Sequence, residues 1–93
     1  MIRSFACEET ARFFATGRSR RIPPALHTRL ILRLTQLDAA ASVHDLRLPP
    51  SNRLESLHGD RKGQWSIRVD AQWRLCFRFV NGDAFDVILV DYH

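Results

Sequence analysis

The last three residues of the chain carry side chains that can transfer protons or donate hydrogen bonds. Asp91, Tyr92 and His93 directly follow an apolar stretch, 85–90, whose pattern is typical of a β-strand. A carboxylate, a phenol and an imidazole are group types that general acid–base catalysis uses. The pattern therefore indicates a catalytic end of the chain, with a solvated tail as the alternative.

Two arginines add positive charge near this end. If 70–72 forms the turn between two strands, Arg68 and Arg74 lie directly opposite each other on one face of a sheet. Like charges in such a pair destabilise it, so we expect an anion between the two guanidinium groups. The alternative is neutralisation by a nearby carboxylate of Glu55, Asp60 or Asp70.

The overall charge favours a polyanionic partner. The 93 residues carry a net charge of +4, and thirteen of the fourteen basic residues are arginine. Arginine binds phosphate in a bidentate manner and stacks on bases, which suits RNA, although a GC-rich genome also enriches arginine. RNA cleavage without a metal needs a base for the 2′-hydroxyl, cations at the phosphate and an acid for the leaving oxygen. These group types are present in Arg68, Arg74, Tyr92 and His93.

The segment 55–62 is a second candidate cluster, because it mixes acids, bases and a histidine just before the predicted strands. Its members are Glu55, His58, Asp60, Arg61 and Lys62. A charged, solvated loop is the alternative interpretation. Candidates for contacts with RNA phosphates are Arg61, Lys62, Arg68 and Arg78.

Neither a metal nor a nucleotide cofactor is predicted. Gly59 and Gly63 make no phosphate-binding loop, and Cys7 and Cys76 lie far apart in the sequence, so we expect free, buried thiols. No apolar run approaches the roughly 18 to 20 residues of a membrane span, and the N-terminus lacks the apolar stretch of a signal peptide. These features predict a soluble cytoplasmic protein.

The candidate residues need a scaffold, and the length allows one domain, 1–93, with one modest core. A helix is predicted over 8–16, with two acids in its first turn and a stop at Gly17. A second helix is predicted from the Pro23–Pro24 pair to about Ala41. Its apolar stripe consists of Leu26, Leu30, Leu34 and Leu37.

Apolar and polar residues alternate over 65–69, 73–79 and 85–89, which predicts half-buried antiparallel strands. A short edge strand is predicted over 2–5. One sheet face is polar, and its residues are Ser66, Arg68, Arg74, Cys76, Arg78 and Tyr92. The opposite face is apolar, so the leucine stripe of the second helix must cover it.

The triplet Asn81, Gly82 and Asp83 predicts a hairpin between the last two strands. We expect a three-residue loop, because a two-residue loop would set Phe77 against Asp86. The longer loop pairs Phe79 with Phe85, Phe77 with Val87, Leu75 with Leu89 and Arg78 with Asp86. Strict alternation then places Tyr92 on the arginine face and Asp91 on the other face.

Three motifs in order resemble the HigB family of toxins, also called proteic killer toxins. The run 52–69 is similar to the family's hallmark segment, 72–77 to its N/Q-W-R-hydrophobic-x-F strand, and 90–93 to its terminal D-Y-H. The opening residues and the stretches at Gly17 and 37–40 fit as well. The resemblance therefore spans nearly the whole chain.

The resemblance implies a RelE-like α+β fold, with two N-terminal helices packed on a curved antiparallel sheet of about four strands. It also implies ribosome-dependent cleavage of messenger RNA. The implied partners are the ribosome, messenger RNA and a HigA-type antitoxin with a helix-turn-helix domain, with operator DNA contacted only through the antitoxin. No membrane partner is implied.

The resemblance also extends to single site residues. By position, the residues that match the family's active-site set are Arg74, Asp91, Tyr92 and His93. A position that is histidine in some relatives is Glu55 here, with His58 three residues later, so Glu55, His58 or neither takes that role. Our hypothesis is that His93 or Asp91 helps to activate the 2′-hydroxyl, or that Asp91 orients a neighbour. The phosphate would be stabilised by Arg68 and Arg74, and Tyr92 would orient the substrate or donate a proton.

Two other functions remain open, because fold alone does not settle function. ParE-type toxins of the same superfold poison DNA gyrase without being enzymes. The terminal acid and base groups beside Arg74 favour the nuclease, because a pure binder does not need them. The third alternative is a degenerate toxin that survives only as an antitoxin-bound DNA-binding partner.

Overall fold

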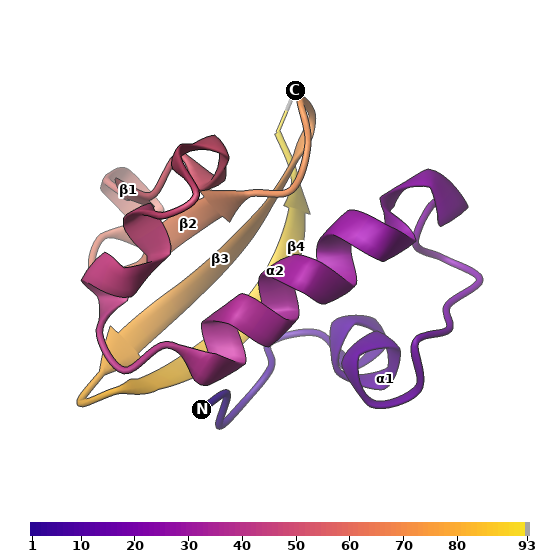
Figure 1. The fold of residues 1–93 in the computed structure, drawn as a ribbon, viewed down its shortest axis with the longest axis horizontal. Coiled ribbons are helices and arrows are strands. Elements are labelled where there is room, and N and C mark those ends of the chain that lie inside the picture. The colour runs from indigo at the N-terminus through magenta and orange to yellow at the C-terminus, as the bar shows by residue number, and fades with distance from the viewer. Residues whose placement is uncertain (93) are drawn as a thin grey trace.

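Two α-helices pack against one four-stranded sheet in the computed structural model, which describes residues 1–92 (Figure 1). α1 spans Glu8–Thr16 and α2 spans His27–Ala39. In Figure 1 α2 crosses in front of the sheet, and α1 lies to one side, where it contacts β4. The predicted α+β class is confirmed. No helix in the described part of the chain is long and apolar enough to cross a membrane.

Both helices follow from local sequence signals. α1 ends where Gly17 takes the left-handed conformation, with φ of 72°, as its sequence predicts. The first turn before α2, Pro24–Leu26, is a 3-10 helix rather than an α-helix. α2 ends at Ala39, slightly before the predicted end, because the hydroxyl of Ser42 and the carboxylate of Asp45 form a capping box that starts the next 3-10 turn.

The sheet has the order β1-β2-β3-β4, and all neighbouring strands are antiparallel. The strands are β1 (Glu55–Ser56), β2 (Trp65–Arg68), β3 (Trp73–Val80) and β4 (Asp83–Asp91). The prediction of about four strands is correct in number. However, β1 lies in the charged segment 55–62, whereas the strand expected over 2–5 does not form.

The segment 2–5 instead runs parallel to β4 and makes two isolated bridges, Ile2 with Ala84 and Phe5 with Val87. The amide of Ile2 donates to the carboxylate of Asp38 on α2 at 2.8 Å instead of to a strand. The β4 backbone also bulges between the two bridges. The predicted edge strand is therefore wrong as a strand, although the segment does lie along β4.

The β3–β4 hairpin differs from the predicted loop. Val80 pairs with Asp83, so only Asn81 and Gly82 form the loop, and both have positive φ (51° and 84°), as type I′ turns require. A bulge then inserts one extra residue into β4, where Asp86 has a φ of 55°. The serine hydroxyl of Ser4 accepts from the Asp86 amide at 2.9 Å and helps to hold this backbone.

The bulge divides the predicted hairpin pairs into correct and incorrect ones. Beyond it, the predicted pair of Leu75 with Leu89 is confirmed. Before it, Phe79 pairs with Ala84, and Phe85 pairs with Arg78, so Phe85 lies on the polar face and not on the apolar face. The guanidinium of Arg78 packs over the Phe85 ring at 5.5 Å and still forms the predicted ion pair with Asp86 at 2.8 Å.

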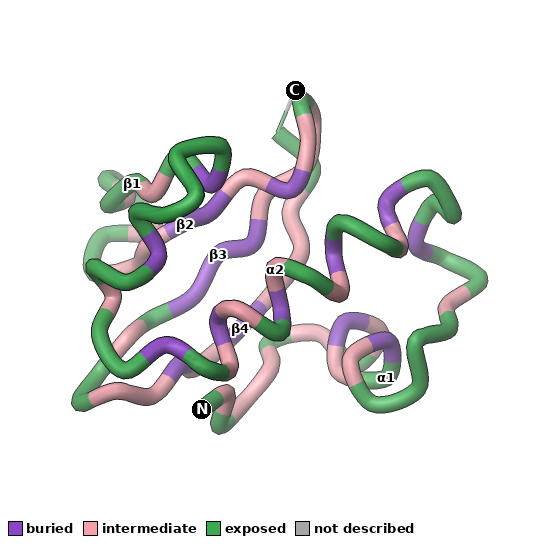
Figure 2. Tube along the Cα trace, in the orientation of Figure 1, coloured by how far each residue is buried: buried purple, intermediate pink, exposed green. Residues whose placement is uncertain are grey.

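The core lies between the helices and the apolar face of the sheet, where the buried segments of Figure 2 face one another. The predicted leucine stripe of α2 is confirmed, because all its members are buried. They are Leu26, Leu30, Leu34 and Leu37. From the sheet, Ile67, Leu75, Phe77, Ala84 and Val87 complete the core.

Truncating one leucine of the stripe tests this packing. Leu34 is 0% exposed, and Leu32 on the same helix is 54% exposed. We expect Leu34→Ala to lower the free energy of unfolding by about 2 to 5 kcal/mol, because a buried cavity adds to the lost transfer energy. Leu32→Ala is the matched control and should change it by less than about 0.5 kcal/mol. Urea unfolding of both variants measures this, and similar values would contradict the packing.

Candidate active site

Arg74 is the centre of the polar sheet face. The register of β2 with β3 places Arg68 opposite Arg74 and Ser66 opposite Cys76, as predicted. The Arg74 Nε donates to the hydroxyl of Ser66 at 2.8 Å, and its Nη2 donates to the backbone oxygen of Arg53 at 2.6 Å. The side chain is only 11% exposed. Its Nη1 makes no hydrogen bond within residues 1–92, so two charged donors remain for a ligand.

Ser66 and Cys76 form a buried polar layer beneath the arginine. Both residues are fully buried, as predicted for Cys76 but not for Ser66, and both lie on the face that was predicted to be polar. The longer side chains of the face lie over them, and one of these is Arg74 itself. Sequence reasoning missed Ser66 as a site residue. The available signal was its predicted position across from Cys76 and one strand away from Arg74.

Tyr92 joins this layer from the end of β4. Its hydroxyl lies 3.8 Å from the sulfur of Cys76, within the distance of a hydrogen bond to sulfur. Burial of the hydroxyl, together with this contact, raises the pKa of Tyr92, although 39% of the residue is exposed. Burial likewise raises the pKa of the Cys76 thiol. Tyr92 therefore stays protonated at neutral pH and can act as a donor.

Two further charged groups border Arg74 and Tyr92. The Glu55 carboxylate on β1 lies 3.9 Å from Nη2 of Arg74, and its side chain is 60% exposed. Such an exposed pair contributes little stability, so the carboxylate is available to solvent or substrate. The second group is Arg61, in the 3-10 turn Gly59–Arg61. Burial is the largest effect on the pKa values of the Tyr92 hydroxyl and the Cys76 thiol and raises both, whereas the positive charge of Arg61 lowers both.

Several predicted site residues lie apart from this group. Arg68 is the cross-strand neighbour of Arg74, but its Nε donates to the backbone oxygen of Asp70 at 3.0 Å, so the two side chains share no hydrogen-bond partner among the described residues. Arg78 lies toward the opposite end of β3, paired with Asp86. His58 and Lys62 are exposed at the two ends of the turn that contains Arg61, with no hydrogen bond to Arg74 or Tyr92.

The terminal residues divide between the two faces of the sheet. Asp91 pairs with Trp73 across the strands, and its carboxylate accepts from the Gln72 amide at 3.1 Å. Tyr92 lies on the Arg74 face, as strict alternation predicts. His93, which the sequence places in the catalytic set, lies outside the described residues.

The group that the fold brings together is a cationic, hydrogen-bonding surface with one open carboxylate. Its members are Glu55, Arg61, Ser66, Arg74, Cys76 and Tyr92. No cluster of three or more metal-ligating side chains is present in residues 1–92. The two cysteines are free thiols, and Cys7 is only partly buried, contrary to expectation. The arrangement can bind an anion at Arg74 and donate a proton or hydrogen bond from Tyr92.

The raised pKa of the Tyr92 hydroxyl can be measured directly, because Tyr92 is the only tyrosine of the chain. In an ultraviolet titration of the folded protein, we expect the tyrosinate band to rise at a pH above the usual midpoint of about 10. Cys76→Ala removes the thiol contact and should lower the midpoint toward that of the urea-unfolded chain. A folded-state midpoint equal to the unfolded one would contradict the described environment.

Comparison of the sequence with known proteins identifies its family. A model of the family described as "RelE-like toxin of type II toxin-antitoxin system HigB" matches residues 3–93. "Endoribonuclease HigB" of Proteus vulgaris is 38% identical over 93 residues, which is 100% of both chains. "Toxin HigB-1" of Vibrio cholerae is 47% identical over 72 residues, covering 77% of this chain and 76% of that protein.

Solved structures support the fold independently. A point mutant of YafQ from E. coli superimposes with a TM-score of 0.66 at 16% identity, over 98% of this chain and 91% of that chain. A chain of the YoeB–YefM complex from Staphylococcus aureus gives a TM-score of 0.58 at 15% identity, over 100% of this chain and 95% of that chain. The resemblance stated from the sequence is thereby confirmed. The chain belongs to the RelE-like HigB toxins of type II toxin–antitoxin systems.

Proposed function

We propose that this toxin is an endoribonuclease that cleaves messenger RNA on the ribosome, without a metal or other cofactor. The observation that carries the proposal is the free Nη1 of Arg74 beside the protonated hydroxyl of Tyr92 on one sheet face. The name of the full-length relative from Proteus vulgaris adds support for RNA cleavage. Gyrase poisoning is not favoured, because the matching family is HigB.

The first step of the proposed reaction is proton removal from the 2′-hydroxyl of the nucleotide before the cut. Glu55 is the carboxylate next to Arg74, so we assign it as the base that accepts this proton. His93 is an alternative base, and Asp91 is another if the chain end rearranges. His58 is the least supported of the candidate bases. The resulting 2′-oxygen attacks phosphorus and forms the new P–O bond.

The second part of the reaction is charge stabilisation and departure of the 5′-oxygen. Arg74, with Arg61 nearby, would stabilise the negative charge on the phosphate oxygens in the transition state. Tyr92 would give its proton to the 5′-oxygen as the P–O bond breaks, and it would regain a proton from water. The products are a 2′,3′-cyclic phosphate and a 5′-hydroxyl. Because a ribosome can place the substrate, modest acids and bases suffice.

The proposed protein partner is an antitoxin. Membership of a type II toxin family implies one, and we assign it to the HigA type with a helix-turn-helix domain. Contact with operator DNA would then pass through that antitoxin. Lys62 and Arg78 stay candidates for contacts with RNA phosphates outside the site, where Lys62 is exposed and Arg78 pairs with Asp86.

A translation reaction that contains the purified toxin tests the function, with Arg74→Gln as the inactive variant. We expect codon-linked cuts in the messenger RNA with the natural chain, and a loss of about 10² to 10³ in cleavage rate with Arg74→Gln, the size of losing one charge-stabilising donor. Arg47→Gln removes an equal charge at an exposed position and should cut at the natural rate.

Two results would overturn this proposal. Loss of DNA supercoiling by gyrase without messenger RNA cuts would show the ParE-type function instead. Full cleavage by Arg74→Gln would remove the arginine from the mechanism. Because Arg74 also holds the loop at Arg53, the variants are compared by thermal melting, and Arg74→Lys, which keeps the charge but loses the planar fork, should fold and show intermediate activity.

The hydroxyl of Ser66 is expected to act as a positioning group for Arg74. Ser66→Ala should lower kcat by about tenfold with little change in KM, because Nε loses its partner while the charge remains. Ser56→Ala, on the exposed neighbouring strand β1, is the matched control. A change confined to thermal stability, with kcat intact, would reduce Ser66 to a structural residue.

A further inference from the structure

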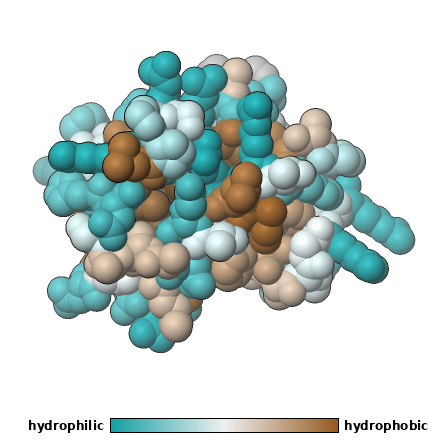
Figure 3. Space-filling model, viewed as in Figure 1, coloured by the Kyte–Doolittle hydropathy of each residue, from teal (hydrophilic) through white to brown (hydrophobic). Residues whose placement is uncertain are grey.

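A hollow of about 460 Å³ lies between α2 and the end of β2, on the α2 side of the fold. Three arginines, one serine and one aspartate supply its polar groups, and an exposed leucine and a valine complete the lining. The residues are Arg29, Leu32, Arg33, Ser51, Arg68, Val69 and Asp70. Figure 3 shows that this face of the molecule is mostly hydrophilic around its rim, with apolar side chains gathered near its middle.

Arg33 is fixed in this hollow by neutral groups alone. Its Nε donates to the backbone oxygen of Arg68 at 3.0 Å, and Nη2 reaches the hydroxyl of Ser51 at 3.4 Å. Nη1 reaches the Gln36 side chain at 3.5 Å, so both terminal contacts are long. Burial, and then repulsion from Arg29, lowers the pKa of Arg33.

The positive charge of the hollow exceeds its negative charge, because three arginines line it with the one carboxylate of Asp70. Within residues 1–92, no carboxylate forms an ion pair with Arg29, Arg33 or Arg68. Asp70 lines the hollow, but its Oδ1 accepts from the amides of Gln72 and Trp73, each at 2.8 Å, which fixes it as the cap of the turn. Arg29 and Arg33 are four residues apart on α2, a spacing at which like charges destabilise a helix. A bound anion would offset this repulsion.

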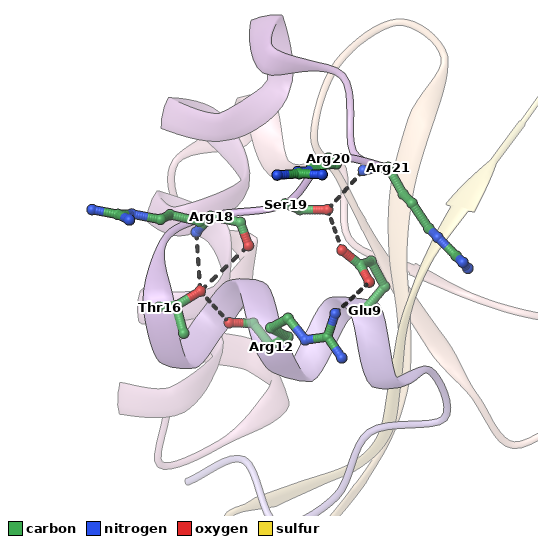
Figure 4. A pocket seen from close by; sticks show the side chains of 7 residues that line it. All are labelled: Glu9, Arg12, Thr16, Arg18, Ser19, Arg20 and Arg21. Atoms are coloured by element: carbon green, nitrogen blue, oxygen red, sulfur yellow. Dashed lines mark hydrogen bonds and ion pairs between the residues drawn. The ribbon is translucent and has the colours of Figure 1, made fainter.

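The larger hollow beside α1 is lined by four arginines and one carboxylate, and it differs because that carboxylate forms an ion pair with one of the arginines. There the Glu9 carboxylate accepts from the hydroxyl of Ser19 and pairs with Arg12 at 3.6 Å (Figure 4). The side chains of Arg18 and Arg21 extend outward on opposite sides of that hollow (Figure 4). One arginine of that hollow is therefore paired with a carboxylate, whereas none of the three arginines of the α2 hollow forms such a pair within residues 1–92.

We propose that the hollow at Arg29, Arg33 and Ser51 binds a phosphate of the RNA chain, next to the nucleotide that is cut. Guanidinium groups with a hydroxyl are the donors that phosphate oxygens prefer. Arg68 links the two places, because it lines the hollow and pairs across the strands with Arg74. The exposed Leu32 offers an apolar surface to a ribose or a base. The identity of the ligand as RNA rests on the proposed function.

RNA fits this hollow better than an acidic protein segment does. A protein segment would need a continuous apolar strip for its own side chains, and the hollow offers one exposed leucine among charged groups. An RNA chain presents a phosphate at every nucleotide, so a chain held at Arg74 brings its next phosphates to neighbouring cations. The acidic-protein alternative is one outcome of the test.

The test measures binding of a short RNA in which every 2′-hydroxyl is methylated, so that it cannot be cut. Arg29→Gln is the main variant, because Arg29 makes no hydrogen bond or ion pair within residues 1–92, and its loss leaves the fold intact. We expect roughly three- to tenfold weaker binding and a salt dependence reduced by about 0.7 in log–log slope, the value for one phosphate contact on a single strand. Arg29→Lys should restore part of the affinity.

Arg20→Gln, an exposed arginine of the α1 hollow, is the matched control with the same net charge. An equal loss in both variants would overturn the subsite, because it would reflect overall charge alone. Unchanged RNA binding by Arg29→Gln, absence of RNA binding by the natural chain, or a loss seen only with purified antitoxin would also overturn it. Since the probe RNA is not cleaved, these outcomes stay separate from the mapping of messenger RNA cuts that tests the enzyme.

Discussion

The bulge at Asp86 is the constraint on which the site depends. The Asn81–Gly82 turn by itself would carry β4 past β3 with Val87 opposite Cys76, so Tyr92 would fall on the apolar face. The extra residue at Asp86 shifts the register, so that Ile88 pairs with Cys76 and Val90 with Arg74. Aspartate accepts the left-handed conformation more readily than most residues, and Ser4 and Arg78 hold it there. One strand, β4, thereby supplies apolar side chains to the core and also leads to Tyr92 on the polar face.

The second constraint is the buried layer of Ser66 and Cys76. An arginine that is mostly buried is costly unless its donors find partners, and neutral oxygens supply them at Nε and Nη2 without cancelling the charge. The guanidinium is thus held in one orientation while its positive charge is kept for a ligand. Burial, and then the contact with the Cys76 thiol, raises the pKa of Tyr92 and so favours its protonated form.

Periodicity was sufficient to predict the features whose signals lie close together in the sequence. The leucine stripe of α2, the stop at Gly17 and the pairing of Arg68 with Arg74 follow from local pattern and side-chain compatibility. The pair of Leu75 with Leu89 was predicted correctly, although the predicted loop was wrong. A three-residue loop gives the same pairs beyond the bulge as a two-residue loop followed by one extra residue in β4. The burial of Ser66 could not be predicted, because it depends on the conformation of the Arg74 side chain that bonds to it from the neighbouring strand. β1 is too short to have a periodicity of its own.

The β2 strand explains how so small a fold can hold two cationic places. The pairing of β2 with β3 places Arg74 over Ser66 on the polar face. At Arg68, where β1 no longer pairs with β2, the backbone oxygen of β2 accepts a hydrogen bond from Nε of Arg33 on α2. α2 therefore has two roles, with leucines covering the core and arginines closing the edge of the sheet. Had β1 continued alongside Arg68, its backbone would have taken the carbonyl that Arg33 now binds. The shortness of β1 is thus what leaves room for the arginine hollow beside the site.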